Sequence, residues 1–265
     1  MQTALTIAGS DSSCGAGIQA DIKTFHAHGV FGLSAITAVT VQNTQKVYGV
    51  QEIMPGIIYD QITCLFDDIN IHAVKIGMVS SLSSIDAVSR ALKKVNLPPV
   101  VLDPVMISTS GYQLMDPDAQ RAICKKLFPL AYVVTPNIIE AELLTSSKIK
   151  DIDEMKSAAR EIASHGAQNV VIKGGHLDEC YATDVCYDGN SMKEIKSPRI
   201  NTRNTHGTGC TFSSAIAANL AKGKNFFQAA KNAKVYITKA IEHSISIGKG
   251  FGPTNHFFPG LSDLD

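Results

Sequence analysis

The stretch Val170-Val171-Ile172-Lys173-Gly174-Gly175 joins a continuous apolar run to a lysine and a glycine turn. Short apolar runs of this kind are expected of parallel strands, because helices cover both faces of a parallel sheet. Five similar runs, each followed by a turn signal and an amphipathic stretch, occur at 4–8, 34–41, 73–76, 100–102 and 132–135. This alternation predicts a doubly wound α/β fold.

The sheet is expected to be mostly parallel, with helices on both faces, which makes a three-layer architecture. Helices are predicted at about 16–28, 56–69, 81–95, 117–128, 137–145, 151–165, 212–220 and 226–247. The turn signal Asp188-Gly189-Asn190 predicts an antiparallel hairpin near 181–195, at an edge of the sheet. No linker or repeat divides the chain, so residues 1–265 are predicted to form a single domain.

Composition excludes several classes of partner. The 24 lysines and arginines balance the 24 aspartates and glutamates, so no net field attracts nucleic acid or an anionic membrane. The six cysteines form no Cys-x-x-Cys pair, which argues against zinc and favours reduced thiols. The N-terminal stretch lacks the features of a signal peptide, and no apolar run is long enough for a membrane span. We therefore expect a cytoplasmic protein.

A second glycine turn, Asn204-Thr205-His206-Gly207-Thr208-Gly209-Cys210-Thr211, precedes the apolar run from Phe212 to Leu220. A turn that opens a helix aims free backbone N–H groups and the positive end of the helix dipole at one point, so it predicts an anion site. In that field Cys210 is expected to favour the thiolate. The alternative is that Cys210 is a small apolar core residue.

Ligands of open α/β sheets bind outside the carboxyl ends of the strands, so the residues that follow each strand are candidates for a site. Asp103 either helps to hold a metal or caps a turn before Pro104. Asn137 and Glu140 either form a capping box or face the cleft together, with Glu140 ordering hydrated Mg²⁺. Lys173 suits a phosphate, although an ordinary surface lysine is the alternative.

A pocket for a small flat polar molecule is predicted near Asp21, Gln42 and Met78. The amide and the carboxylate would bind ring nitrogens and amines, whereas Met78 and Val105 would supply apolar walls. Taken singly, Met78 and Val105 are more often core residues. The first loop lacks both the Walker ending and the Rossmann spacing, so dinucleotide binding is not expected.

Together these segments resemble one known family, the hydroxymethylpyrimidine/phosphomethylpyrimidine kinases of thiamine biosynthesis, which are ribokinase-like. The resemblance extends from about residue 3 to residue 260. The segments that carry it are Ala8-Gly9-Ser10-Asp11, Cys14-Gly15-Ala16-Gly17-Ile18-Gln19-Ala20-Asp21, Val41-Gln42-Asn43-Thr44, Lys75-Ile76-Gly77-Met78, Leu102-Asp103-Pro104-Val105-Met106, Thr135-Pro136-Asn137, Lys173-Gly174-Gly175-His176 and the turn at 204–211.

This resemblance implies ATP-dependent phosphorylation of 4-amino-5-hydroxymethyl-2-methylpyrimidine and then of its monophosphate. The pyrimidine is expected near Gly9, Asp21, Gln42, Met78 and Val105. ATP is expected near Lys173, Asn137 and Thr208, and Mg²⁺ near Asp103 and Glu140. Cys210 would stand beside the attacking group, with the N–H groups of Gly207 and Gly209 as part of the catalytic turn. Related kinases are commonly dimers, so a homodimer is expected.

Cys210 also bears on the choice of substrate. Sugar kinases of the wider superfamily have Gly-Ala-Gly-Asp where this chain has Gly207-Thr208-Gly209-Cys210, and their aspartate is the base. Cysteine matches the pyrimidine-kinase branch. Two alternatives are left open: a pyridoxal kinase of the same fold, and a catalytically silent pyrimidine-binding sensor. His176 and His206 lie inside the motifs without an assigned role.

Overall fold

The computed structural model describes residues 1–258 apart from 108–110, 112–114, 176 and 178–179. Its strands are β1 (Thr3–Asp11), β2 (Phe31–Gln42), β3 (Val47–Glu52), β4 (Ala73–Ile76), β5 (Val100–Leu102), β6 (Val133–Val134), β7 (Asn169–Ile172), β8 (Tyr181–Tyr187) and β9 (Met192–Pro198). Its helices are α1 (Gly17–Ala27), α2 (Pro55–Asp68), α3 (Leu82–Leu92), α4 (Pro117–Lys126), α5 (Ile138–Thr145), α6 (Ile152–Ser164), α7 (Thr208–Ala221) and α8 (Phe226–Glu242), with a short 3₁₀ turn at Phe128–Leu130.

These strands form one sheet in the order β3-β2-β1-β4-β5-β6-β7-β8-β9. The six strands from β2 to β7 in this order pair in parallel, as predicted, and β8–β9 is the predicted antiparallel hairpin. The chain leaves β1 toward β2 on one side and returns to β4 on the other. Such a reversal of strand order opens a crevice at the carboxyl ends of the strands, so the sheet itself determines where a ligand can bind.

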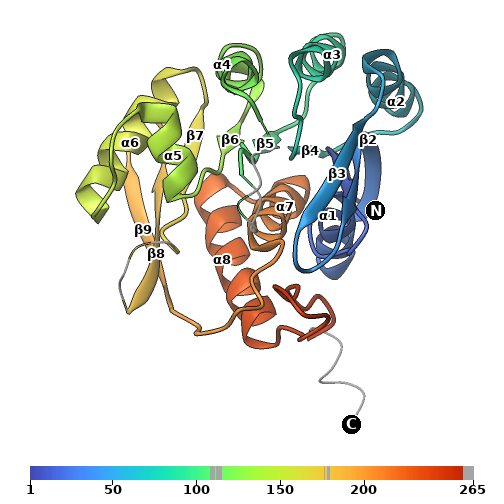
Figure 1. Cartoon of the computed structure of the whole chain (residues 1–265). Helices are drawn as coiled ribbons and strands as arrows, with labels where there is room; N and C mark the ends of the chain where they lie inside the picture. The colour runs from blue at the N-terminus through green and yellow to red at the C-terminus, as the bar shows by residue number, and fades with distance from the viewer. Residues whose placement is uncertain (108–110, 112–114, 176, 178–179, 259–265) are drawn as a thin grey trace.

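Helices cover both faces of the sheet, which confirms the three-layer prediction (Figure 1). Helices α1, α7 and α8 pack on one face through Phe25, Phe212, Ile216 and the alanines around them. Helices α2 to α6 pack on the other face, where Ile62, Ile85 and their neighbours form the larger core cluster. The central strands β4, β5 and β6 are buried at every residue, which explains their short signal, apolar except for Lys75.

The structure differs from the sequence prediction mainly at element ends and at one strand. Strand β3, which was not predicted, pairs antiparallel with β2 at the edge of the sheet. Its sequence contains Gly49 and two polar residues, and half of its residues are exposed, so it lacks a strand pattern. Helix α7 begins at Thr208 instead of residue 212, because Gly207 supplies its N-cap. Helix α8 ends at Glu242, about one turn before the predicted end.

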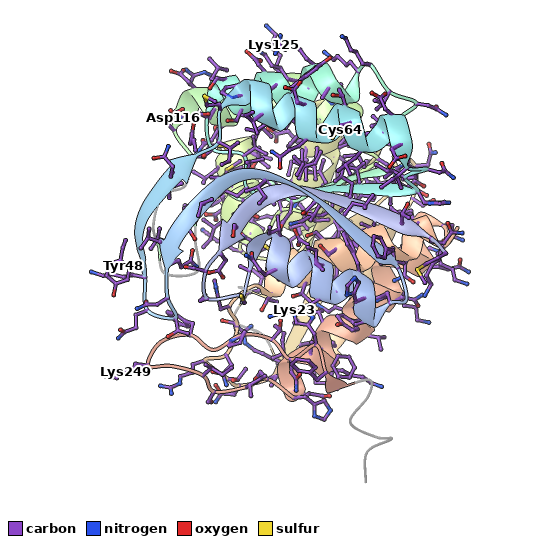
Figure 2. All side chains as sticks on the ribbon, turned by 90° about the vertical axis from the view of Figure 1, so that its right-hand side faces the viewer. Lys23, Tyr48, Cys64, Asp116, Lys125 and Lys249 are labelled. Atoms are coloured by element: carbon purple, nitrogen blue, oxygen red, sulfur yellow. The ribbon has the colours of Figure 1, made fainter. Side chains whose placement is uncertain are left out.

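The segment after α8 returns across the carboxyl edge of the sheet. The N–H of Phe251 donates to the Thr44 carbonyl at 2.8 Å, and the N–H of His206 donates to the Gly252 carbonyl at 3.1 Å. Figure 2 shows Lys249 of this segment below the outer end of the β2–β3 ribbon, where Tyr48 points outward. The segment therefore links the β2–β3 ribbon to the second glycine turn.

All six cysteines are free thiols, as expected of reduced cysteines. Among the described helices, none combines the length and the apolar character that a membrane span requires.

One prediction concerns His256, which packs on α8 with Nδ1 3.1 Å from the Tyr236 hydroxyl. Burial, with Lys23 and His28 adding to it, lowers the pKa of His256 from 6.5 to about 4. The unfolded chain therefore binds a proton that the fold excludes, so this contribution to stability is complete above the unfolded pKa and is lost as the pH falls toward 4. As the pH falls toward 4, the free energy of unfolding should therefore decrease by on the order of 2–3 kcal/mol less in His256→Gln than in the parent chain.

Urea titrations at several pH values between about 7 and about 4 check this expectation. The same pH dependence in the variant as in the parent chain would contradict it.

Candidate active site

The carboxyl ends of the central strands bring the predicted residues to one edge of the sheet. Asp103 follows β5, Asn137 follows β6 and Lys173 follows β7, and Asn137 and Lys173 form a parallel bridge. The N-terminus of α7 lies against these strand ends. A Cβ atom placed on Gly209 would lie 3.2 Å from Lys173 Nζ and 3.3 Å from Asp103 Oδ2. The structure thus joins the predicted phosphate lysine to the predicted anion turn.

Gly207 caps α7 in the left-handed region, with φ of 77°. A Cβ atom at this position would lie 1.7 Å from the carbonyl oxygen of Gly15, so only glycine fits between the second glycine turn and the first loop. Thr208, Gly209 and Cys210 form the first helical turn, whose N–H groups have no partner within a helix. The side chain of Thr208 donates to the Thr205 carbonyl at 2.6 Å, which holds the turn closed.

A hydrogen bond between the side chains of Asp11 and His206 holds the first loop against this turn. Nε2 of His206 lies 2.8 Å from Oδ2 of Asp11, and both side chains are buried. The Asp11 carboxylate also accepts the N–H groups of Ser13, Gly15 and Ala16. Although burial raises the pKa of Asp11, the bonds from His206 and Ser13 outweigh it and lower the pKa to about 2. His206 therefore has a structural partner, whereas His176 lies outside the described residues.

Asp103 and Lys173 form an ion pair in the site, with 2.9 Å between Oδ1 and Nζ. Thr135 donates to the same oxygen at 3.2 Å. Burial opposes the charged form of Lys173, but Asp103 and Glu140 outweigh burial and raise the pKa of Lys173 above its ordinary value. The ammonium is charged and 15 % of the side chain is exposed, so it can still reach an anion at the glycine turn.

The capping-box interpretation of Asn137 and Glu140 is confirmed. The two residues form a capping box at the start of α5, with Oε2 of Glu140 2.8 Å from the Asn137 nitrogen. Glu140 is also buried beside Lys173 and Asp103. Burial raises its pKa, Lys173 opposes that effect and Asp103 adds to it, so that the pKa of Glu140 is about 7. Two carboxylates thus share a buried region with the ammonium group of Lys173.

This donor set fits a hydrated Mg²⁺ carried by a nucleotide. Mg²⁺ prefers one or two carboxylates together with phosphate oxygens and water, and a divalent cation would relieve the repulsion that raises the pKa of Glu140. Among the described residues, no cluster of three or more metal-binding side chains occurs. The pair Asp103 and Glu140 therefore suits a metal that arrives with a phosphate ligand better than a metal held by protein alone.

A second ion pair, Asp21 with Lys75, is buried against α7, which contributes Ser214 to it. The two side chains are fully buried, with 2.9 Å between Oδ2 and Nζ. Thr6 donates to Oδ2 of Asp21 at 2.6 Å and Ser214 to Oδ1 at 2.7 Å. Asp21 was predicted to line the pocket, but here it has no exposed surface and both of its oxygens have partners. Its contacts are those of a residue that holds Lys75 in place.

Lys75 was not assigned a role from the sequence. Burial lowers its pKa, but Asp21, Cys210 and Asp103 outweigh burial and raise the pKa above the usual value. A Cβ atom on Gly77 would lie 2.6 Å from Lys75 Nζ, so the glycine makes room for the amine. The available signal was a lysine inside the otherwise apolar strand Ala73-Val74-Lys75-Ile76, because a lysine is rarely buried without a partner.

The thiol of Cys210 is half-buried at the start of α7. Burial raises its pKa, Lys75 opposes this effect, and Asp21 and Asp103 add to it, which leaves the pKa of Cys210 at about 11. The expectation of a lowered pKa is therefore wrong for this structure, because burial near two carboxylates exceeds the effect of Lys75 and of the Gly17 N–H. Lys75 is nevertheless the cation placed to stabilise a thiolate.

The remaining pocket residues lie at the ends of β1, β2, β4 and β5. A Cβ atom on Gly9 would lie 2.4 Å from Met78 Cε, so this glycine makes room for the Met78 side chain. Gln42 ends β2, and its amide nitrogen lies 3.3 Å from Nε2 of His206. Val105 follows Asp103 and is half-buried. In the structure Gly9 thus packs against Met78, and Gln42 lies next to His206 of the second glycine turn.

An anion turn at the carboxyl edge of a doubly wound sheet, with a lysine and two carboxylates beside it, is the arrangement of a small-molecule kinase. The comparisons with known proteins are more specific. The phosphomethylpyrimidine kinase family model matches residues 11–255, and the chain belongs to this family. A relative from Rhizobium meliloti, named hydroxymethylpyrimidine/phosphomethylpyrimidine kinase, is 49% identical over 257 residues, which cover 96% of each chain.

Two further matches define the length and the fold. A bifunctional thiamine biosynthesis protein from Geobacter sulfurreducens is 47% identical over 95% of this chain, and the aligned region covers 51% of the relative, so this chain spans about half of that protein. The crystal structure of an ADP complex of Bacillus subtilis pyridoxal kinase superposes with a TM-score of 0.91 at 41% identity and covers 98% of this chain and 99% of the other. The fold is therefore ribokinase-like.

The second prediction tests Glu140. Glu140→Gln keeps a capping-box side chain but removes one carboxylate from the proposed metal region. We expect the Mg²⁺ concentration for half-maximal activity to rise about tenfold, with the KM of the pyrimidine unchanged.

Steady-state titrations with Mg²⁺ at saturating ATP measure this effect. Glu142→Gln, on the same helix but paired with Lys148 at the surface, is the control. An unchanged Mg²⁺ requirement in the Glu140 variant would exclude Glu140 from the metal region.

Proposed function

We propose that this chain uses ATP to phosphorylate 4-amino-5-hydroxymethyl-2-methylpyrimidine and then its monophosphate, for thiamine biosynthesis. The observation that carries the proposal is the meeting of Lys173, Asp103 and Gly209 at the N-terminus of α7, in a chain of the phosphomethylpyrimidine kinase family. Phosphoryl transfer depends on positioning and on neutralisation of charge. The proximity of these three residues supports a role in both.

In this proposal the N–H groups of Gly207, Gly209 and Cys210 receive the transferring phosphate, and Lys173 adds a fixed positive charge. The N–H of Thr208 already donates to the Thr205 carbonyl at 3.2 Å. Asn137 and Thr208 lie beside the nucleotide. Asp103 and Glu140 would hold Mg²⁺, which supplies further neutralisation of the phosphate oxygens. Asp103 also holds Lys173 at 2.9 Å, so the ammonium has a fixed direction before the nucleotide binds.

We place the pyrimidine near Gly9, Gln42, Met78 and Val105. Gln42 is the strongest candidate for reading polar ring atoms, because an amide offers both donor and acceptor groups. Asp21 contributes through Lys75 in the structure described here, since its own oxygens already accept bonds from Thr6, Ser214 and Lys75. This assignment changes the role of Asp21 from direct contact to electrostatic support of the reacting region.

Cys210 would act as the base for the alcohol. With a pKa near 11, a value that already includes the effect of Lys75, the thiol is protonated at neutral pH. It must therefore first lose its own proton to water, and only the minor thiolate population, with Lys75 beside it, can then accept the proton of the alcohol. The second reaction needs no base, because its nucleophile is a phosphate oxygen that is already largely ionised near neutral pH. The two reactions therefore depend differently on the same thiol.

A second candidate is pyridoxal phosphorylation, which the likeness to the Bacillus subtilis pyridoxal kinase favours. An aromatic ring with a hydroxymethyl arm suits the same region.

We also propose a cytoplasmic location, one domain over the whole chain, and a homodimer. The exposed apolar side chains Val39, Val41 and Tyr48 on the β2–β3 ribbon support the dimer.

A coupled kinase assay with the pyrimidine alcohol, its monophosphate and pyridoxal tests the proposal directly. We expect turnover of both pyrimidines and a kcat/KM for pyridoxal below that for the alcohol. Absence of turnover with either pyrimidine would overturn the main proposal, whereas a higher kcat/KM for pyridoxal would favour the second candidate.

The fourth prediction separates the two reactions. Cys210→Ala should lower the kcat for the alcohol by about 100-fold or more and change the kcat for the monophosphate far less. Single-turnover rates with each substrate measure the difference, and Cys186→Ala, in a buried cysteine of β8, is the control. Equal losses in both reactions would mean that Cys210 positions the phosphate and removes no proton.

A further inference from the structure

The carboxylate of Asp184 makes two contacts that join three parts of the fold. Asp184 lies on β8, and its Oδ2 is 2.8 Å from Nζ of Lys234 on α8. Its Oδ1 accepts the backbone N–H of Gly174 at 3.0 Å. Asp184 is 3% exposed and Lys234 6% exposed. One buried side chain therefore connects the β8–β9 hairpin, helix α8 and Gly174, the residue that follows Lys173.

Burial of this ion pair needs an explanation other than stability. Removing two charges from water costs several kcal/mol per ion, and apolar pairs of similar size often stabilise a fold equally well or better. Two apolar side chains would suffice to pack α8 against β8. An apolar residue at position 184 could not, however, accept the N–H of Gly174, which is the contact specific to a carboxylate or an amide.

The turn at Lys173 and Gly174 is held from both sides. The N–H of Lys173 donates to the Pro136 carbonyl at 2.9 Å, and its Nζ contacts Asp103. A Cβ atom on Gly174 would lie 1.8 Å from the Thr183 carbonyl oxygen, so the turn packs directly on β8. The bond from Gly174 to Asp184 fixes the peptide on the other side of the lysine.

We propose that Asp184 is a positioning residue for the nucleotide site, with Lys234 as its electrostatic partner. Asp184 holds the Gly174 peptide, which fixes the backbone from which Lys173 reaches the phosphate. The inference rests on the proposed role of Lys173 in ATP binding. Loss of the Gly174 bond then weakens ATP binding and leaves pyrimidine binding unchanged.

Two double variants separate the hydrogen bond from the charge. D184N/K234M is neutral but keeps an amide oxygen for the Gly174 N–H, whereas D184L/K234M is neutral and offers no acceptor. We expect the dissociation constant of ATP to rise about tenfold in D184L/K234M and to stay within about twofold of the parent value in D184N/K234M. Pyrimidine affinity, measured by calorimetry on the same samples, reports an intact fold.

A control lies in the same hairpin. Glu194 on β9 pairs with Lys156 on α6 at 3.0 Å, and Glu194→Gln removes this pair without touching the turn at Lys173. We expect its ATP affinity to match that of the parent chain. If the leucine variant fails to fold, D184A/K234M provides a second variant without an acceptor.

A double-mutant cycle decides whether Asp184 acts through Lys173. In a Lys173→Gln background, adding D184L/K234M should cause little further loss of ATP affinity, because the group that the turn positions is already absent. Independent, multiplicative losses would overturn the proposal, as would unchanged ATP affinity in D184L/K234M. If Lys173→Gln itself leaves ATP affinity unchanged, the proposed role of Lys173 fails, and this outcome is separate from the others.

Discussion

The contact between two backbone turns, at Gly15 and Gly207, is the constraint on which the site depends. A Cβ atom on Gly207 would lie 1.7 Å from the Gly15 carbonyl oxygen, and the Asp11–His206 pair holds the same two turns together. Because α7 begins at this contact, its direction and the aim of its N–H groups follow from it. The contact also places the Gln42 amide next to His206, so both proposed halves of the site share one support.

Two ion pairs and one carboxylate–histidine hydrogen bond surround the start of α7. The ion pairs Asp21–Lys75 and Asp103–Lys173 lie beside its first turns, and the Asp11–His206 bond lies before its start. Each pair is held by further hydrogen bonds, which is the condition under which a buried charge is tolerated. The charges are therefore fixed in direction before any ligand arrives, and electrostatic stabilisation of transferring phosphate requires such preorganisation.

The sequence predicted the parallel strands and the residues at their carboxyl ends, since a buried strand has a short apolar pattern and its end is marked by a turn. Strand β3 was not predicted, because an edge strand with Gly49 and exposed polar residues has no such pattern. Asp11 and Lys75 received no role, because their partners His206 and Asp21 are distant in the chain. The pKa of Cys210 was wrongly expected to fall, because burial raises it and the carboxylates of Asp21 and Asp103, which come from other elements, add to that effect.

The Asp11–His206 contact joins residues 195 positions apart. During synthesis, Asp11 at the end of β1 is made long before its partner His206. Folding of the site therefore cannot be completed during most of translation, and loop closure over such a separation is slow. A chain that terminates before residue 204 would lack α7 and α8, so it would lose the second glycine turn together with most of the helical layer on one face of the sheet.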